Sequence, residues 1–246
     1  MTSAAPNILL LAGSTEARQI AARLQAQGHS LRALVSEPPR GPNPMPVPCR
    51  LHPFDNAETL AAQLDGVTAV IDASHGFDPA MTDIGAAAAR IAQVPFLSYS
   101  RPAWDASAHP TWQAVRDMRA AMPLIAPGSR VFAATGWQSL AACADFPGAA
   151  LLLRQTVRHD RAPPYPFVDL VFGMPPFTAE SEQALFERLS VDLLICRNLG
   201  GTASRPKLDA ALALDLPVLL IDRPPRPQGV ATVDRVEAVL DWVATL

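Results

Sequence analysis

Short, continuous apolar runs alternate along the chain with longer segments in which apolar residues recur at helical spacing. The apolar runs are too short for helices but long enough for buried strands. The longer segments are rich in Ala, Arg, Glu and Gln, and several end at Gly or Pro, as helices commonly do. We expect strands over 8–12, 31–35, 67–71, 96–99, 131–134, 151–156, 168–172, 193–196 and 218–221.

The segments between these runs are expected to be helices. Regular alternation implies parallel sheets whose right-handed crossovers place helices on both faces. The sequence therefore predicts an α/β fold of two Rossmann-like domains, 1–122 and 123–246, each with a mostly parallel sheet flanked by helices. Ligands bind beyond the carboxyl ends of such strands, so the active site is expected in the interdomain cleft. The helices are expected over 15–27, 57–64, 79–93, 112–122, 137–144, 178–189, 206–214 and 233–246.

Composition narrows the class of protein. With 246 residues, 49% of them hydrophobic and 17% charged, the chain can bury a core and lacks the signature of disorder. A net charge of −3 without a basic stripe argues against a nucleic-acid partner. Cys49, Cys143 and Cys196 are widely spaced and indicate neither disulfides nor a metal site. The apolar run 8–12 is too short for a signal core or a membrane span, so a cytoplasmic location without membrane contact is expected.

The first strand leads into a turn that could bind phosphate. Gly13, Ser14, Thr15 and Glu16 lie where a strand meets a helix, so backbone N–H groups and the positive end of the helix dipole would face an anion. A dinucleotide pyrophosphate would fit there. The full G-x-G-x-x-G pattern is absent, and a helix that is merely capped by Ser14 or Thr15 is the alternative.

The end of the second strand is the expected ribose site. Ser36, Glu37 and Arg40 follow the glycine turn by about 20 residues, the usual spacing in dinucleotide-binding domains. Glu37 would suit a free ribose 2′-hydroxyl, whereas Ser36 and Arg40 would suit a 2′-phosphate. The choice between NADH and NADPH stays open here, as does a solvated loop that binds nothing.

Two more strand ends carry candidate chemistry. Ser74 and His75 follow the third strand, where Ser74 could contact a cofactor and His75 could donate a proton or bind a carboxylate. A histidine at this point can also be only a hydrogen-bonded loop residue. Tyr99, Arg101 and Trp104 follow the fourth strand and could dock an acidic, conjugated substrate, or form a packed hinge.

The second half of the chain repeats the glycine-rich turn. Thr135 and Gly136 end one strand, and Asn198, Gly200 and Gly201 lie between another strand and a helix, so these residues are further candidates for cofactor contacts. The helix that follows carries Lys207, the only lysine of the chain. This suggests a specific chemical task for its amine, although an exposed helix position is the alternative.

Seven short motifs occur in order along the chain: LLLAGSTEAR at 9–18, DASHGF at 72–77, YSRPAW at 99–104, FAATG at 132–136, GMPPFT at 173–178, CRNLGG at 196–201 and IDRP at 221–224. In this order they resemble the precorrin-6A reductase family over essentially the whole chain. The resemblance implies reduction of one ring double bond of precorrin-6A, giving precorrin-6B in cobalamin biosynthesis. The hydride would come from a reduced nicotinamide, with no metal or flavin.

The implied reaction suggests roles for several residues. The substrate carries many carboxylates, so Arg101, Arg197 and Arg205, together with Lys207, are expected to clamp it. His75 and Tyr99 are candidate proton donors, with bulk water or the substrate's own carboxylates as the alternatives.

Several alternatives stay open at this point. NADPH and the metal-free substrate are favoured, with an NADH-dependent cobalt-precorrin-6A reductase as the alternative. Other readings of the sequence are a Rossmann-type oxidoreductase or epimerase for a smaller acidic metabolite, and a non-enzymatic NAD(P)H-sensing module. The sequence does not predict the oligomeric state.

Overall fold

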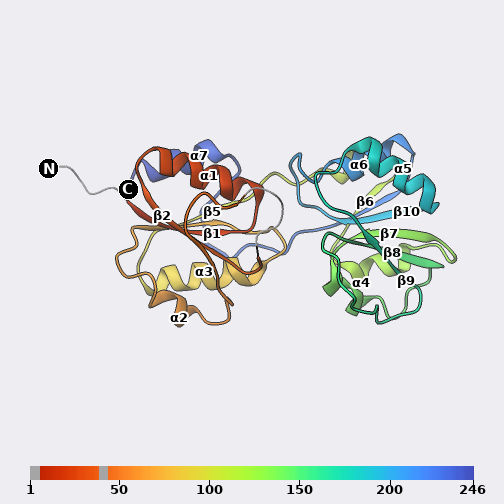
Figure 1. Ribbon diagram of the computed structural model, residues 1–246, viewed down its shortest axis with the longest axis horizontal. Coiled ribbons are helices and arrows are strands. Elements are labelled where there is room, and N and C mark those ends of the chain that lie inside the picture. The colour runs from red at the N-terminus through yellow and green to blue at the C-terminus, as the bar shows by residue number, and fades with distance from the viewer. Residues whose placement is uncertain (1–5, 39–43) are drawn as a thin grey trace. The chain divides into compact units, whose positions relative to one another are not determined.

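The computed structural model describes residues 6–38 and 44–246. These residues form two compact units, each of which is an α/β unit in its own right (Figure 1). Unit 1 contains the described residues up to Pro102 together with Pro224–Leu246, and unit 2 contains Ala103–Arg223. Each unit has one six-stranded sheet, and every strand pairing is parallel.

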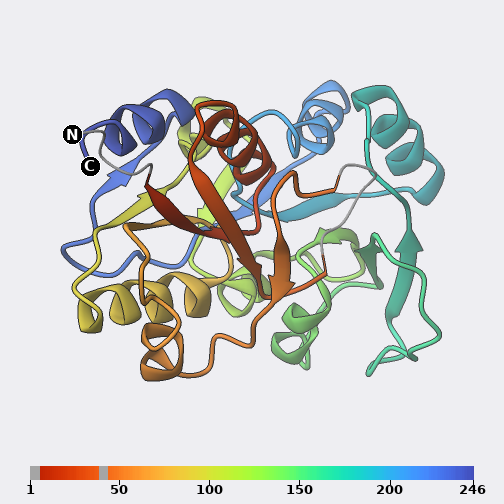
Figure 2. The same ribbon diagram turned by 60° about the vertical axis from the view of Figure 1, so that its left-hand side comes forward.

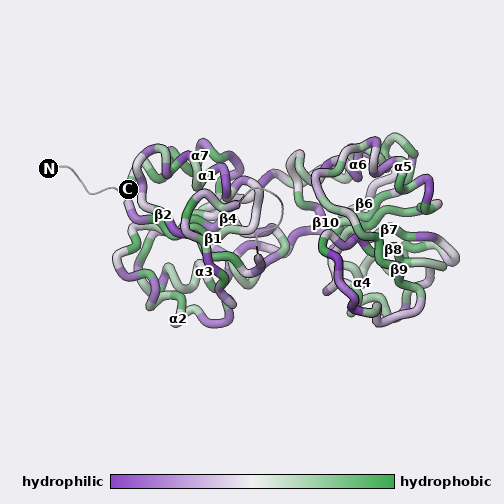
Figure 3. The backbone as a smooth tube through the Cα atoms, in the orientation of Figure 1, coloured by the Kyte–Doolittle hydropathy of each residue, from purple (hydrophilic) through white to green (hydrophobic). Residues whose placement is uncertain are grey.

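The sheet of unit 1 has the strand order β12-β5-β4-β1-β2-β3. Its two central strands, β1 and β4, are almost wholly buried and apolar, as expected for strands that are covered on both faces (Figure 3). The strands are β1 (Asn7–Ala12), β2 (Ser30–Val35), β3 (Cys49–Leu51), β4 (Ala69–Ala73), β5 (Phe96–Tyr99) and β12 (Thr232–Val233).

Helices cover both faces of this sheet (Figures 1 and 2). On one face, α1 (Thr15–Ala26) packs beside α7 (Val236–Val243), and both bury aliphatic side chains against the strands. On the other face, α2 (Ala57–Ala61) packs beside α3 (Pro79–Ile91), whose alanine-rich stripe allows close approach to the sheet. The sheet is therefore the middle layer of three.

The sheet of unit 2 has the strand order β6-β11-β10-β7-β8-β9. Its strands are β6 (Trp112–Val115), β7 (Arg130–Ala134), β8 (Ala150–Gln155), β9 (Val168–Phe172), β10 (Leu193–Arg197) and β11 (Val218–Ile221). Helices α5 and α6 cover one face, while α4 and η3 lie together on the other. The helical segments are η1 (Ala106–Ala108), α4 (Met118–Ala121), η2 (Met122–Leu124), η3 (Trp137–Ala142), α5 (Ala179–Leu189) and α6 (Pro206–Ala213), where η marks a 3-10 helix.

The two sheets share the strand order of a doubly wound dinucleotide-binding fold. The winding reverses between β1 and β4 in unit 1 and between β7 and β10 in unit 2. Such switch points are where ligands bind in open α/β sheets. Each sheet takes its sixth strand from an unexpected part of the chain: β12 follows all the strands of unit 2, and β6 precedes the first strand of its own sheet.

The expected fold of two Rossmann-like domains is confirmed, but some local predictions are wrong. The segment 112–122 was expected to be one helix, whereas its first residues form β6, because Trp112–Val115 pairs with β11. The closing helix begins at Val236 because Thr232–Val233 pairs with β5. For the same reasons, the observed units do not divide between residues 122 and 123.

Candidate functional site

The turn after β1 lies against the end of β4, at the switch point of unit 1. The backbone N–H groups of Gly13 and Ser14 both donate to the carbonyl oxygen of Ala73, each over 3.1 Å. A Cβ atom at Gly13 would come within 2.5 Å of the backbone nitrogen of His75, so no larger residue fits without a backbone shift. The glycine therefore allows the two strand ends, and any ligand between them, to come close together.

Helix α1 begins directly after this turn. Ser14 is its N-cap and accepts a hydrogen bond from the N–H of Ala17. A helix leaves the N–H groups of its first turn without intrahelical partners. Here the N–H of Ser14 donates to Ala73 and that of Ala17 donates to Ser14. The N–H groups of Thr15 and Glu16 are therefore the donors that an anion could use. The turn is thus a capped helix start that also keeps an anion-binding capacity.

Glu16 connects this turn to the end of β5. Its carboxylate lies 3.2 Å from Nε of Arg101 as an ion pair, with the two side chains 17% and 13% exposed. Burial raises the pKa of Tyr99 to about 12, and the charge of Glu16 adds to this rise while Arg101 opposes it. The phenol of Tyr99 therefore keeps its proton throughout the neutral range.

A buried polar network joins the ends of β4 and β5 to the segment before β12. Asp72 is fully buried and accepts hydrogen bonds from Ser98, Thr82 and the N–H of Ser74. Nη1 of Arg226 lies 2.6 Å from the same carboxylate and also contacts the hydroxyls of Ser98 and Thr82. The buried negative charge is thereby neutralised and fully hydrogen-bonded, as a buried ion pair requires.

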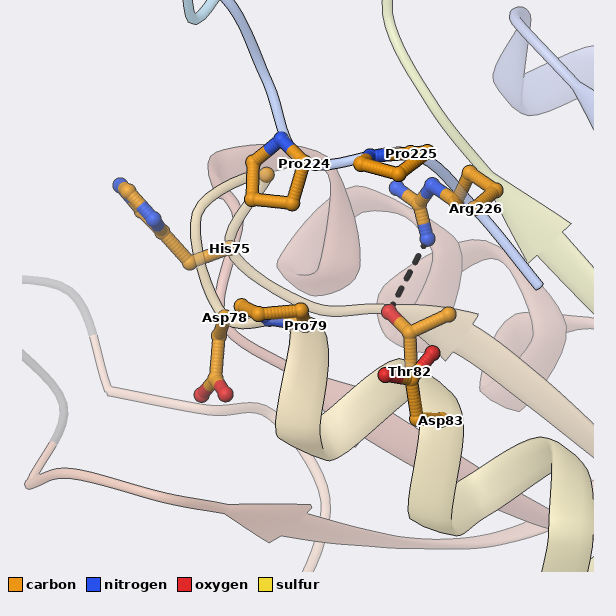
Figure 4. Close-up of a pocket in the computed structure, with 9 residues that line it drawn as sticks. His75, Asp78, Pro79, Thr82, Asp83, Pro224, Pro225 and Arg226 are labelled. Carbon is orange, nitrogen blue, oxygen red and sulfur yellow. Dashed lines mark hydrogen bonds between the residues drawn. The ribbon is translucent and has the colours of Figure 1, made fainter. Parts of the chain in front are cut away.

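A small pocket lies beside this network in unit 1 (Figure 4). The ring of His75 points away from Arg226 and Thr82, and its Nδ1 accepts a hydrogen bond from the N–H of Phe77, which places the proton of a neutral ring on Nε2. The residues that line the pocket are His75, Gly76, Asp78, Pro79, Thr82, Asp83, Pro224, Pro225 and Arg226.

The expected ribose residues lie partly in this region. The hydroxyl of Ser36 donates to Asp78 over 2.5 Å, and Asp78 in turn caps α3 through the N–H of Met81. Ser36 is therefore held by the start of α3, close to the pocket of unit 1. Arg40, which was also expected near the ribose, lies outside the described residues.

In unit 2, Asn198 holds the loop that carries Trp104. Its Oδ1 accepts from the N–H of Trp104 and its Nδ2 donates to the carbonyl of the same residue, both over 2.9 Å. The indole Nε1 of Trp104 donates to the carbonyl of Gly201. Since Asn198 is buried and uses both ends of its amide in this way, it positions Trp104.

The second switch point lies between β7 and β10. Thr135 is buried and shares a hydrogen bond with Ser139 over 2.7 Å. Gly136 has a positive φ of 83°, and a Cβ there would come within 3.1 Å of the guanidinium of Arg197. Thus Arg197 lies over Gly136 at this switch point. Gly200 and Gly201 also have positive φ, which suits glycine in the tight turn before α6.

Lys207 lies at the start of α6, where Nζ donates to the carbonyl of Ser204. Burial lowers its pKa, while Cys196 and Glu182 act in the opposite direction. Burial also raises the pKa of Cys196 to about 11, so this thiol is inert. The environment of Lys207 therefore differs from that of an ordinary exposed lysine, and its amine loses a proton more readily.

Arg205 is bound within the same helix. Its Nε lies 2.7 Å from Asp209, and its guanidinium lies over the ring of Trp112. Of the arginines expected to clamp a substrate, Arg101 and Arg205 therefore both face carboxylates of their own unit.

Sequence reasoning missed two groups of residues. The first is the Asp72–Arg226 pair, which could have been noticed in the sequence because Asp72 is a charged residue inside an otherwise apolar strand. The second, which we call the Trp137 cluster, comprises Trp137, Arg158, His159, Arg161 and Phe172. It could have been noticed in the sequence as RHDR at 158–161, shortly after the end of β8.

Neither a membrane helix nor a metal cluster appears in the part of the chain that the structure describes. No helix among these residues is long and apolar enough to cross a membrane. The same residues contain no group of three or more His, Cys, Asp or Glu side chains arranged to hold a metal ion.

Residues 7–244 match the family model described as "Precorrin-6x reductase CbiJ/CobK". A protein of Rhodococcus erythropolis named precorrin-6A reductase is 36% identical over 97% of this chain and 98% of its own length. A cobalt-precorrin-6A reductase of Priestia megaterium is 26% identical over 88% and 90%.

A solved structure has the same architecture. The structure titled "CobK precorrin-6A reductase" superposes with a TM-score of 0.87 and is 32% identical, covering 98% of this chain and 96% of that one. The match in fold and in sequence thus extends over both units.

Proposed function

The chain belongs to the precorrin-6x reductase CbiJ/CobK family, and from this membership we propose that it reduces precorrin-6A to precorrin-6B. The observation that carries the proposal is a match that extends over both Rossmann-like units and nearly the full length of relatives named for this reaction. The chain is thus an oxidoreductase that acts on a ring double bond.

The family uses a nicotinamide cofactor, and NADPH is the form we propose for this chain. The switch point of unit 1 suits a dinucleotide, since Gly13 lets the turn lie close against the end of β4 and α1 presents the N–H groups of Thr15 and Glu16. These amides would hold the pyrophosphate, and Ser36 would face the adenosine ribose. When bound, the reduced nicotinamide supplies the hydride.

The residues of this chain then have two tasks besides binding. They must orient the macrocycle in a site from which water is excluded, and a proton must reach the carbon next to the one that is reduced. Tyr99 holds its proton on Oη at neutral pH, because burial raises its pKa to about 12. In the neutral form of His75, the proton lies on Nε2. These two atoms are the proposed proton donors.

Contacts to the carboxylates of the substrate are proposed for Arg197 in unit 2, which lies over the Gly136 turn at a switch point. Arg101 and Arg205 already face Glu16 and Asp209, so each would have to exchange or share that partner to bind a substrate carboxylate. Lys207, the remaining proposed clamp, donates to a backbone carbonyl and has a lowered pKa.

Metal-free precorrin-6A is the proposed substrate. Relatives named precorrin-6A reductase are between 29% and 36% identical to this chain, against 26% for a relative named for the cobalt form. Turnover of both rings under identical anaerobic conditions tests this choice. We expect a higher kcat/KM for the metal-free ring, and a preference for the cobalt ring would contradict the proposal.

The experiment that tests the function follows pigment absorbance and NADPH oxidation together in the purified protein. We expect precorrin-dependent oxidation, faster with NADPH than with NADH. Oxidation that depends on a smaller acidic metabolite and not on the macrocycle would point to another oxidoreductase. Binding of NADPH without turnover of any of these compounds would point to a sensing module.

A further inference from the structure

The Trp137 cluster lies at the carboxyl ends of three neighbouring strands of unit 2. Trp137 opens η3 directly after the Gly136 turn of β7, His159 follows β8, and Phe172 is the last residue of β9. Since β7, β8 and β9 are adjacent and parallel, these strand ends meet at one edge of the sheet. This is the edge at which an α/β sheet binds its ligands.

Three rings of the cluster are in contact with one another. The ring of His159 lies edge-on to that of Trp137 at 5.2 Å and to that of Phe172 at 5.6 Å, measured between centroids. The His159 ring is fixed at both nitrogens, because Nδ1 accepts from the N–H of Arg161 and Nε2 lies 3.4 Å from the side-chain oxygen of Gln155. The three rings thus form an ordered surface.

Two exposed arginines stack on this surface. The guanidinium of Arg161 lies 4.2 Å from the centre of the Trp137 ring, and that of Arg158 lies 5.3 Å from the centre of Phe172. A guanidinium that stacks on a ring keeps the N–H groups at its edge available for carboxylates. Asp160 lies between the two arginines in sequence, so the segment 158–161 has at least one net positive charge.

The same region exposes apolar side chains. Val157, beside Arg158, is 58% exposed, and Met174, two residues beyond Phe172, is 77% exposed. Exposed apolar groups, half-buried rings and cations at this end of the sheet together suit a ligand that is apolar in its body and acidic at its rim.

We propose that the Trp137 cluster is the surface of unit 2 that binds a conjugated, polycarboxylate macrocycle. The ring face of the ligand lies on the apolar and aromatic side chains, and Arg158 and Arg161 bind its acidic substituents. This inference rests on the proposed function. A flat pigment with several carboxylates is the ligand class that fits both the aromatic side chains and the arginines of the cluster.

Three full-length variants test the proposal. Trp137→Leu removes the aromatic surface, Arg158→Gln with Arg161→Gln removes the charges, and Arg119→Gln is the control at an exposed arginine elsewhere in unit 2. The probes are precorrin-6A in turnover and uroporphyrin, a stable polycarboxylate porphyrin, in binding. Far-ultraviolet circular dichroism and the Kd for NADPH verify that each variant is folded.

We expect the Trp137 variant and the double arginine variant each to raise the KM for precorrin-6A and the Kd for uroporphyrin about tenfold. The Kd for NADPH should stay unchanged, and the control should behave as the wild type. Binding by the wild type should weaken with added salt more steeply than binding by the double arginine variant.

The outcomes separate this proposal from the proposed function. If the wild type reduces precorrin-6A and both cluster variants keep the wild-type KM and porphyrin Kd, the Trp137 cluster does not bind the macrocycle and the proposed function stands. If the wild type binds porphyrin through the cluster but does not reduce precorrin-6A, the surface stands and the function is overturned. If the wild type does neither, both are overturned.

Discussion

Arg226 reaches 154 positions back along the chain to place Nη1 2.6 Å from the carboxylate of Asp72, which is fully buried at the end of β4. The guanidinium also donates to the carbonyl of Tyr99 over 3.4 Å. A single ion pair therefore joins the segment that leads to β12 with two strands at the candidate cofactor site. This segment supplies the sixth strand of unit 1, so the pair bears on both stability and site geometry.

Replacement of Arg226 by Met is expected to destabilise the fold by about 2–4 kcal/mol, because it leaves the buried Asp72 without its cation. Combining it with Asp72→Asn should recover much of this loss, since the uncompensated charge is then removed. Urea unfolding followed by circular dichroism measures both. Arg23→Met is the control: its partner Glu237 is 62% exposed, and such pairs contribute about 1 kcal/mol or less. Equal losses of unfolding free energy in Arg226→Met and Arg23→Met would contradict the role of Arg226 in neutralising the buried Asp72.

Replacement of Gly13 by Ala should weaken NADPH binding at least about tenfold, because the added Cβ would lie 2.5 Å from the backbone nitrogen of His75 and would force the turn apart. Gly28→Ala serves as the matched control, since its Cβ would meet no atom within 4 Å and its cost is backbone strain alone. Fluorescence titration with NADPH measures both affinities. If the Gly13→Ala variant binds NADPH with the wild-type Kd, this turn is not part of the cofactor site.

Tyr99 should produce a pH dependence of stability at high pH. Its pKa is about 12 in the folded protein against an ordinary value of 10.0. Between these values the unfolded chain loses the proton that the folded chain keeps, so stability should fall as pH rises from 10 towards 12. Tyr99→Phe should lack this part of the fall, and urea unfolding across this pH range measures the difference.

The same variant tests the chemistry of Tyr99. As a proton donor, Tyr99 is expected to contribute about a hundredfold to kcat. Unchanged turnover in Tyr99→Phe, with the fold intact, would leave His75 as the remaining proposed donor. Turnover of a His75→Phe variant at the wild-type rate would in turn exclude that residue.

Lys207 offers a direct titration, because it is the only lysine of the chain. Protein labelled with ¹³C at the lysine ε-carbon should give one lysine signal, whose shift with pH reports the pKa of Lys207. We expect a value below the ordinary 10.5, because burial disfavours the charged amine. In the pH range below 10.5, the unfolded chain then holds the proton more tightly, so this group adds stability as pH rises. A signal that titrates as in a free peptide would contradict the burial.

The alternation of strands and helices could be predicted because it is local. Runs such as 8–12 and 218–221 are apolar whatever they pair with, and the strand ends placed Gly13, His75 and Gly136 correctly at turns. Strand β6 could not be predicted in this way. Trp112–Val115 has no periodic pattern, and it is a strand only because β11, about a hundred residues later, offers it an edge.

The hydrogen-bond and ion-pair partners of polar side chains also could not be predicted from local sequence patterns. The amide of Asn198 pairs with the backbone of Trp104, 94 positions away, and no local pattern indicates this partner. Arg101 likewise forms an ion pair with Glu16, which lies after a different strand. A sequence motif indicates that a polar residue lies at a strand end, whereas its partner depends on which other strand ends the topology brings there.

Transfer of a labelled hydride tests the central claim most directly. Anaerobic turnover of precorrin-6A with NADPH carrying deuterium at C4 of the nicotinamide, followed by mass spectrometry of the pigment, detects where the label goes. The proposed function predicts a pigment that has gained two hydrogens, one of them deuterium when the transferred face is labelled, in step with NADPH oxidation. NADPH oxidation with no label in the pigment from either labelled face, or no oxidation at all, would contradict it.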